Sequence, residues 1–326
     1  MAVQNREMEL TTRVEMPRME RLIAVGDRLV FLGSCFAEYI GRRFESYGMA
    51  TLSNPLGVLY NPESVRAVVV SACSPGGERG ERDLPLFQSS EGEWRCWLGD
   101  TSFASPTSKE CAERINAMLG QLYTFLSESR FLFVTLGTNV CYRLRETGLT
   151  VTNCHKMPGA MFEEYRLSTS ECATALADVV DMAQRLNPAL HVVFTVSPYR
   201  YRKYGFHGSQ LSKATLLLAV DEVCRRFPSS CTYLPVYEMF MDELRDYRFY
   251  APDMLHPSEV AVDIVWHRIV EHCMSERLQH YLRDYEPIRR ALNHRPTDPE
   301  SEAYHEFLRT TMREREKLME KYECNN

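Results

Sequence analysis

Five short runs of hydrophobic residues recur along the chain, each bounded by polar or turn-forming residues. They lie at residues 28–32, 49–52, 131–136, 191–196 and 232–236. In the clearest two, "FLFVTL" and "HVVFTV", polar and apolar positions do not alternate. Continuous apolar runs of this length are typical of parallel strands that are buried on both faces. The pattern therefore predicts five buried strands.

Between these runs, hydrophobic positions recur at the spacing of an amphipathic helix, as in Phe36, Ile40 and Phe44. Further helices are expected from about residue 64, over 112–126, 168–186 and 209–226, and from Pro257 onward. Proline is well tolerated in the first turn of a helix, so Pro257 fits a helix start. Strands that alternate with helices predict an α/β fold with a doubly wound, mainly parallel sheet.

Two stretches depart from this alternation. Residues 74–109 are polar and rich in glycine and proline, and we interpret them as an insertion that carries a small hairpin. Its Trp94 and Trp97 either stack on a sugar ring or cover the core beneath the insertion. Residues 276–326 have the pattern of charged amphipathic helix and are expected to form a C-terminal extension packed on the domain of residues 1–275. The apolar stripe of that extension is Tyr304, Phe307, Leu308, Met312, Met319 and Tyr322.

Composition narrows the class of protein. With 326 residues, 44% of them hydrophobic and 25% charged, the chain resembles a soluble globular enzyme. Its net charge of −6, and the lack of a basic run interleaved with aromatic residues, argue against nucleic-acid binding. No apolar stretch approaches the roughly 20 residues that a membrane helix needs.

The 11 cysteines are odd in number and irregularly spaced, with no Cys-x-x-Cys pair that would suggest a zinc or redox site. The N-terminal residues lack the apolar core of a signal peptide. Free, mostly buried thiols in a reducing compartment are the simplest interpretation, so a cytoplasmic location is expected.

Candidate chemistry lies where each predicted strand ends. The segments after the five runs contain Ser34, Gly57, Asn139, Ser197 and the pair Asp253 and His256. Because ligands of an open parallel sheet bind outside the carboxyl ends of its strands, these residues are expected to share one edge.

These groups suffice for acyl transfer. A serine hydroxyl becomes a nucleophile when a histidine takes its proton, and the histidine needs an acceptor on its other ring nitrogen. Asp253 and His256 are three residues apart, so one turn of chain can join them. The amides of Ser34 and Gly57 and the side chain of Asn139 are candidate oxyanion donors, and one such donor contributes about 3 kcal/mol.

Each residue also has a structural alternative. Ser34 could cap the following helix, since serine is a favoured N-cap, and Cys35 beside it is a rival nucleophile. Asp253 and His256 could be ordinary loop residues, and Asn139 could serve only a turn. His155 in "NCHK" and Arg200 beyond the fourth run are possible substrate-binding residues, or exposed loop residues.

Six segments, "GSCFAE", "NPLGVLYNP", "TLGTN", "NCHK", "TVSP…SKATLLLA" and "DELRDYRFYAPDMLHPSEVAVD", together resemble the GSCFA family. That family is similar to the SGNH (GDSL-like) hydrolases. The resemblance implies a three-layer α/β/α, flavodoxin-like sandwich, an ester-linked acyl substrate, and neither metal nor organic cofactor. It implies Ser34 as nucleophile, Gly57 and Asn139 as oxyanion residues, and Asp253 and His256 as the remaining triad. The chain departs from relatives at two places where histidine is frequent. One holds Gly99 and Asp100 in "WLGDTSF", and the other holds Tyr201 at the end of "SPYRY".

The leading hypothesis is a serine esterase of SGNH type with a Ser34–His256–Asp253 triad, acting on a small-molecule or carbohydrate ester such as an O-acetylated sugar. An acyltransferase that uses the same residues is the close variant. A non-catalytic binding module on a hydrolase-like fold is the alternative from another class, because folds host unrelated functions.

Overall fold

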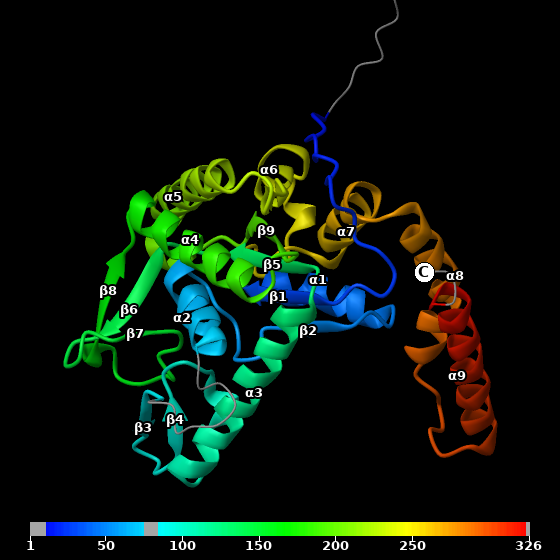
Figure 1. Ribbon diagram of the computed structural model, residues 1–326, viewed down its shortest axis with the longest axis horizontal. Coiled ribbons are helices and arrows are strands. Elements are labelled where there is room, and N and C mark those ends of the chain that lie inside the picture. Colours follow the sequence, from blue (N-terminus) through cyan, green and yellow to red (C-terminus); the bar gives the residue numbers. More distant parts are fainter. Residues whose placement is uncertain (1–10, 75–83, 324–326) are drawn as a thin grey trace, which may run out of the picture.

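A five-stranded sheet forms the centre of the protein, whose computed structural model describes residues 11–74 and 84–323 (Figure 1). Its strands are β1 (Leu29–Gly33), β2 (Thr51–Ser53), β5 (Phe131–Leu136), β9 (His191–Val196) and β10 (Cys231–Tyr233). They lie in the order β10-β9-β5-β1-β2, and every neighbouring pair is parallel. This is the flavodoxin-like order, so the prediction of a doubly wound parallel sheet is confirmed.

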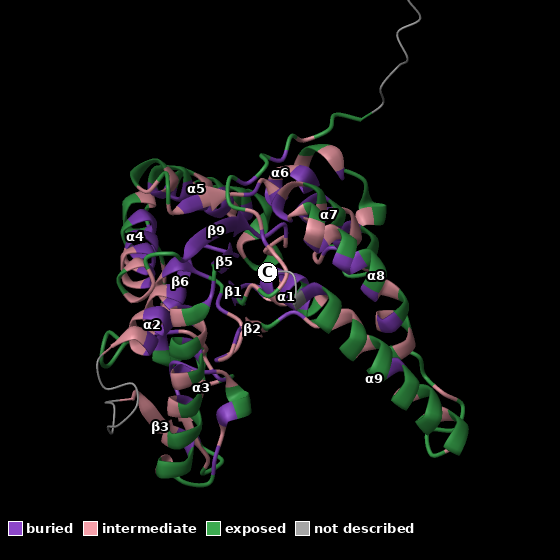
Figure 2. Ribbon diagram, turned by 45° about the vertical axis from the view of Figure 1, so that its right-hand side comes forward, coloured by how far each residue is buried: buried purple, intermediate pink, exposed green. Residues whose placement is uncertain are grey.

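Helices cover both faces of the sheet. Phe31 and Phe133 belong to a core shared with α1 (Cys35–Ser46) and α7 (Glu259–Cys273). Their neighbours Leu32 and Val134 point the other way. That second core is shared with α2 (Pro62–Cys73), α3 (Ser108–Glu128), α4 (Thr169–Leu186) and α5 (Gly205–Arg226). Alternate residues thus enter opposite cores, which explains the continuous apolar runs; Figure 2 shows the buried sheet between its helices.

Helix α7 begins two residues later than expected. Its first residue is Glu259, and the Oγ of Ser258 accepts a hydrogen bond from the backbone N–H of Ala261. A serine that caps a helix in this way satisfies an amide that would otherwise lack a partner. Pro257 therefore precedes the cap instead of occupying the first helical turn.

Two small sheets adjoin the main one. The inserted segment carries the expected hairpin, β3 (Leu86–Gln88) antiparallel to β4 (Trp94–Cys96). The other sheet contains β6 (Val140–Leu144), β7 (Thr150–Val151) and β8 (Phe162–Arg166), all antiparallel. Trp97 is buried, stacked on Phe87 with ring centroids 3.6 Å apart, and packs edge-on against Phe162. Its ring thus joins the two small sheets and is not free to stack on a sugar.

Short helical segments complete the chain up to residue 275. They are α6 (Val236–Glu238), a π-helical turn (Met239–Glu243) and four 3₁₀ turns (Thr101–Phe103, Gly159–Met161, Arg202–Tyr204 and Tyr247–Phe249). None of the helices in the described part of the chain is both long and apolar enough to cross a membrane.

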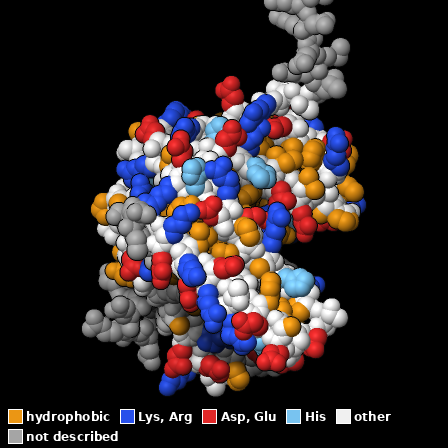
Figure 3. Space-filling view, turned by 90° about the vertical axis from the view of Figure 1, so that its right-hand side faces the viewer, with side chains coloured by type: hydrophobic (Ala, Val, Ile, Leu, Met, Phe, Trp, Pro, Cys, Tyr) orange, Lys and Arg blue, Asp and Glu red, His pale blue; other side chains and the backbone are white. Residues whose placement is uncertain are grey.

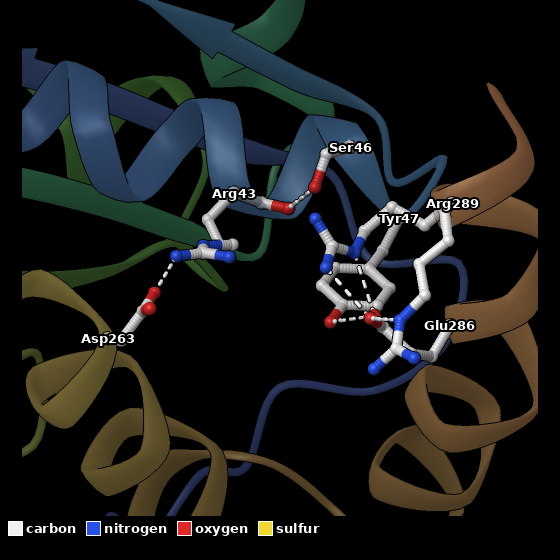
Figure 4. A network of polar contacts seen from close by, with 7 residues as sticks. Arg43, Ser46, Tyr47, Asp263, Glu286 and Arg289 are labelled. Atoms are coloured by element: carbon white, nitrogen blue, oxygen red, sulfur yellow. Dashed lines mark hydrogen bonds and ion pairs between the residues drawn. The ribbon is translucent and has the colours of Figure 1, made fainter. Parts of the chain in front are cut away.

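The C-terminal helices are α8 (Glu276–Leu292) and α9 (Glu302–Glu323). Helix α8 lies against the end of α1, where Tyr281 donates a hydrogen bond to the carbonyl of Tyr47 (2.8 Å). Tyr47 in turn donates one to Glu286 (2.8 Å), as Figure 4 shows. Helix α9 packs on α8 through Tyr322, whereas Phe307 and Met312 are exposed. The apolar stripe expected for this helix is therefore only partly covered.

Candidate active site

The turn after β1 places Ser34 at the point where the strand order of the sheet reverses. One neighbour of β1 is β2, which follows it along the chain, and the other is β5, on the far side. The backbone N–H of Ser34 donates to the carbonyl of Thr135 in β5 (2.9 Å). Gly33 has φ of +130°, and a Cβ there would lie 2.1 Å from the Thr135 oxygen. Only glycine fits this turn, which lies at the usual ligand-binding position of such sheets.

Ser34 occupies the N-cap position of α1, yet its hydroxyl does not cap the helix. Its side chain makes no capping hydrogen bond. The Oγ is buried, and no described residue hydrogen bonds it. A capping role therefore does not explain this serine. Burial, and next the nearby Glu38 carboxylate, raise the pKa of Cys35, so the rival thiol is not activated as a thiolate.

Asp253 and His256 form a compact pair on an exposed loop. Asp253 Oδ2 lies 2.5 Å from His256 Nδ1, and Oδ1 accepts hydrogen bonds from the backbone N–H groups of Leu255 (2.9 Å) and His256 (3.0 Å). The backbone N–H of His256, followed by its ring, lowers the pKa of Asp253 to about 2. A carboxylate in this position fixes the tautomer and orientation of the imidazole through Nδ1 and leaves Nε2 available to accept a proton.

Arg200 contacts that loop, and its substrate-binding role stays a prediction. Its backbone N–H donates to the carbonyl of Leu255 (3.2 Å), and its guanidinium donates to the carbonyl of Met254 (3.3 Å). The guanidinium also lies 4.3 Å from the ring centroid of Phe206. Met254 has φ of +59°, a conformation that is uncommon outside glycine. Arg200 thus supports a strained turn between Asp253 and His256.

Aromatic residues line the part of the candidate site that carries His256. The ring of Tyr199 is 4.4 Å from that of His256. Beside them a cavity of about 980 Å³ is lined by Tyr39 of α1, Tyr250 and His256, among others. Among the described residues, no hydrogen bond joins Ser34 to His256. The Asp253–His256 pair is formed, no hydrogen bond connects it to Ser34, and the triad stays a prediction.

The three expected oxyanion donors already hydrogen bond within the protein. The Ser34 amide donates to Thr135, and the Gly57 amide donates to the carbonyl of Asn54 (2.8 Å). Asn139 Nδ2 donates to the carbonyl of Leu167 (2.7 Å). The oxyanion role of these groups stays a prediction.

Lys213 and Tyr201 were not singled out as site residues from the sequence. Lys213 is buried and donates to the carbonyls of Gly137 and Ser197, both at 2.6 Å, which tie together the loops after β5 and β9. Burial lowers the pKa of Lys213 to about 7. The Tyr201 hydroxyl is buried over Gly137, where a Cβ would meet it at 2.3 Å, and no described residue hydrogen bonds it. Lysine in the apolar segment "SKATLLLA" was the available signal for Lys213.

His155 belongs to the packing of the small sheets. It is buried, its Nε2 lies 2.9 Å from the carbonyl oxygen of Cys96, and its ring contacts Phe87 and Trp97 edge-on. Burial lowers its pKa, so the ring is neutral near pH 7. These contacts give the residue a structural role, and none of them reaches Ser34 or His256.

Within residues 11–74 and 84–323, no three or more His, Cys, Asp or Glu side chains form a cluster that could hold a metal ion. The ten cysteines within the same ranges are all free.

On the face that carries α8 and α9, acidic and basic side chains are interspersed (Figure 3). That face does not offer the continuous basic surface on which nucleic acids bind.

Comparison with known proteins identifies two matching families. The GSCFA family matches residues 28–269, and the family described as "GSCFA domain protein, C-terminal domain" matches residues 285–326. No curated protein matches the chain.

Two solved structures that resemble the protein are carbohydrate esterases. An acetyl xylan esterase from the rumen bacterium Butyrivibrio proteoclasticus is 11% identical, with a TM-score of 0.32, over 65% of this chain and 55% of its own. A family two carbohydrate esterase from Clostridium thermocellum, in complex with cellohexaose, is 12% identical, with a TM-score of 0.33, over 79% of this chain and 64% of its own. The chain thus spans less than two thirds of either protein. Likenesses of this extent carry no argument about activity.

Proposed function

The chain belongs to the GSCFA family, and from this premise we propose that it is a serine esterase that hydrolyses an ester-linked acyl group. The observation that carries the proposal is the state of Ser34. Ser34 lies at the switch point of a flavodoxin-like sheet and is the N-cap residue of α1. Its hydroxyl is buried and has no hydrogen-bond partner among the described residues. A buried hydroxyl without a partner costs stability, which a role in chemistry explains.

In the proposed mechanism, His256 Nε2 takes the proton of the Ser34 hydroxyl while Oγ attacks the acyl carbon. The carbonyl π electrons move to oxygen and give a tetrahedral oxyanion. Its collapse re-forms the carbonyl and expels the alcohol, which takes the proton from His256. Water then repeats the sequence on the acyl-enzyme and releases the acid and Ser34. Asp253 stays ionised throughout and stabilises the imidazolium, which fits the lowering of its pKa to about 2.

Closure of the site on substrate is part of this proposal. Ser34 and His256 share no hydrogen bond, and catalytic hydrogen bonds in free enzymes are frequently long or incomplete. The His256 side chain is 39% exposed, so it is not locked in the core, and the mechanism requires its loop to bring Nε2 to Ser34 when substrate binds. The cavity of about 980 Å³ beside His256 offers room for the acyl or alcohol part. Tyr39, 43% exposed on its wall, presents a ring face of the kind that sugars stack on, so an O-acetylated carbohydrate is the first substrate class to test.

A non-catalytic binding module is the second candidate. The burial of Ser34, which is only 1% exposed, favours it, because a nucleophile must meet its substrate. An acyltransferase shares every residue of the esterase proposal and differs only in the acceptor of the acyl group.

Hydrolysis of short-chain aryl esters by the wild type, Ser34→Ala and Cys35→Ala tests the proposal. We expect turnover by the wild type and Cys35→Ala, and loss of turnover in Ser34→Ala. Equal rates for the wild type and Ser34→Ala would refute the esterase. More acylated sugar than free acid, once an acceptor sugar is supplied, would identify a transferase.

A further inference from the structure

Asn54 is the polar side chain most firmly attached to the turn that carries Ser34. It follows β2 and has φ of +42°, a left-handed conformation that asparagine adopts more readily than most residues. Its side-chain Oδ1 accepts a hydrogen bond from the backbone N–H of Gly33 (2.9 Å), the residue directly before Ser34. Its backbone N–H donates to the carbonyl of Phe31 (2.8 Å) in β1. Both ends of this residue are therefore fixed to the strand that leads to Ser34.

The other half of the same amide is unused. Asn54 Nδ2 is buried, and no described residue accepts a hydrogen bond from it. A buried donor without a partner costs about 1–3 kcal/mol. Because Nδ2 and Oδ1 are bonded to the same carbon and Oδ1 is held by the Gly33 N–H, the unpaired donor belongs to a side chain that is fixed at the turn leading to Ser34.

The fold does not require this nitrogen. An aspartate would accept the same hydrogen bond from Gly33 and tolerates the same backbone conformation, without leaving a donor unpaired. It would, however, place a negative charge beside Ser34, where negative charge must develop on the substrate oxygen. An amide supplies the acceptor that the turn needs and a neutral donor on its other side.

We propose that Asn54 Nδ2 is an oxyanion donor of this enzyme, which holds the acyl oxygen when Ser34 attacks. The proposal rests on the esterase function proposed above. The amides of Ser34 and Gly57 donate to the protein's own carbonyls, whereas Asn54 Nδ2 has no acceptor among the described residues and its side chain is held by Gly33. A side-chain amide that donates to the tetrahedral intermediate acts on the charge formed in the transition state, so its effect falls mainly on kcat.

Asn54→Asp tests the proposal, with Asn61→Asp as a matched control. Asn61 is also buried, and its Oδ1 also accepts from a backbone N–H, that of Ser64 (2.8 Å). Its Nδ2, however, donates to the carbonyl of Val140 (3.2 Å). The same substitution therefore removes a hydrogen bond of the fold at Asn61 and none at Asn54.

The two variants are compared by hydrolysis of 4-nitrophenyl acetate and by thermal unfolding. For Asn54→Asp we expect kcat to fall roughly 10²–10³-fold with a smaller change in KM. We expect its unfolding midpoint to fall less than that of Asn61→Asp, because both variants bury a carboxylate but only Asn61→Asp also breaks a hydrogen bond of the fold. For Asn61→Asp we expect a lower midpoint and nearly normal kcat. The activity of Asn54→Asp relative to the wild type should rise as pH falls, because a protonated carboxyl group regains one O–H donor.

Three outcomes would overturn the proposal. The first is a kcat of Asn54→Asp within about twofold of the wild type, which would make the nitrogen unnecessary for catalysis. The other two are an unfolding midpoint lowered as in Asn61→Asp and failure of Asn54→Asp to fold, because either would make the nitrogen necessary for the fold. Ser34→Ala separates this failure from that of the esterase itself. If Ser34→Ala is inactive while Asn54→Asp is fully active, only the Asn54 proposal fails. If the wild type is inactive, both fail.

Discussion

The two halves of the candidate site are held by opposite means. Ser34 is 1% exposed, and its backbone is fixed to β5 of the central sheet. Asp253 and His256 lie on a loop, with side chains 43% and 39% exposed, and they are joined by hydrogen bonds within four residues of chain. In the proposed mechanism, the sheet holds the nucleophile and the loop orients the base. Because the hydrogen bonds of the Asp253–His256 pair are local, the pair would keep its geometry if the loop moved relative to Ser34.

Removal of the base gives the largest expected effect. Replacing His256 with alanine eliminates the proton acceptor but leaves Ser34 in its turn. We expect kcat for aryl ester hydrolysis to fall by about 10⁴-fold or more, with little change in the unfolding midpoint, because the side chain is partly exposed. Unchanged kcat in steady-state assays would mean that the two halves do not act together.

The Asp253→Asn substitution keeps the shape of the loop and removes the charge. We expect kcat to fall by roughly 10³–10⁴-fold, since a neutral amide no longer fixes the imidazole tautomer. The folded pKa of Asp253 is about 2, below the usual 3.8, so its contribution to stability is present above pH 3.8 and lost as pH falls toward 2. The stabilities of the wild type and this variant should therefore differ by a constant amount above pH 3.8, and the difference should shrink only as pH falls toward 2.

A substitution of Arg200 tests whether its contacts with the loop that carries Asp253 and His256 matter for activity. Arg200→Lys keeps the positive charge but loses the planar contact with Phe206 and the hydrogen bond to Met254. We expect kcat to fall roughly tenfold while KM changes less, because a displaced imidazole weakens proton transfer rather than binding. Arg202→Lys, an adjacent exposed arginine, is the control and should be normal. A rise in KM alone would return Arg200 to the substrate-binding role suggested by the sequence.

Lys213, which joins the loops after β5 and β9, is tested by measuring the free energy of unfolding. Its substitution is expected to have the smallest effect on activity of those considered. Its folded pKa of about 7 lies below the ordinary 10.5, so the unfolded chain binds more protons between these values. Stability therefore rises with pH across that window, by up to about 1.4 kcal/mol per pH unit from this group. In urea unfolding from pH 7 to 10, Lys213→Met should lack this contribution. Parallel curves for the two proteins would contradict the burial of a titrating lysine.

Much of the fold could be predicted from the sequence, because its strands and helices depend on patterns of neighbouring residues. Strands buried on both faces leave continuous apolar runs, and four of the five predicted runs agree with the strands to within two residues at each end. The fifth, 232–236, extends three residues beyond the end of β10 at Tyr233. The pairing of Asp253 with His256 followed from their three-residue spacing. The start of α7 was misplaced because proline and serine both favour helix starts, and the Ser258 side chain makes the capping bond.

The rest depended on long-range contacts that spacing does not encode. The acceptor role of Asn54 requires the N–H of Gly33, 21 residues away, and His155 is packed by Cys96 and Trp97, 59 and 58 positions earlier. Arg200 contacts Met254 across 54 positions. In each case the sequence indicated a polar residue near a strand end or turn, and only the fold determined which partner it meets.

The most direct measurement of the central claim, that Ser34 and His256 work together, is labelling by a fluorophosphonate probe read out by mass spectrometry. The account predicts one adduct on Ser34 in the wild type, and a labelling rate reduced by orders of magnitude in His256→Ala. Absence of the adduct in folded wild-type protein, or labelling of Ser34 at the same rate without His256, would contradict it.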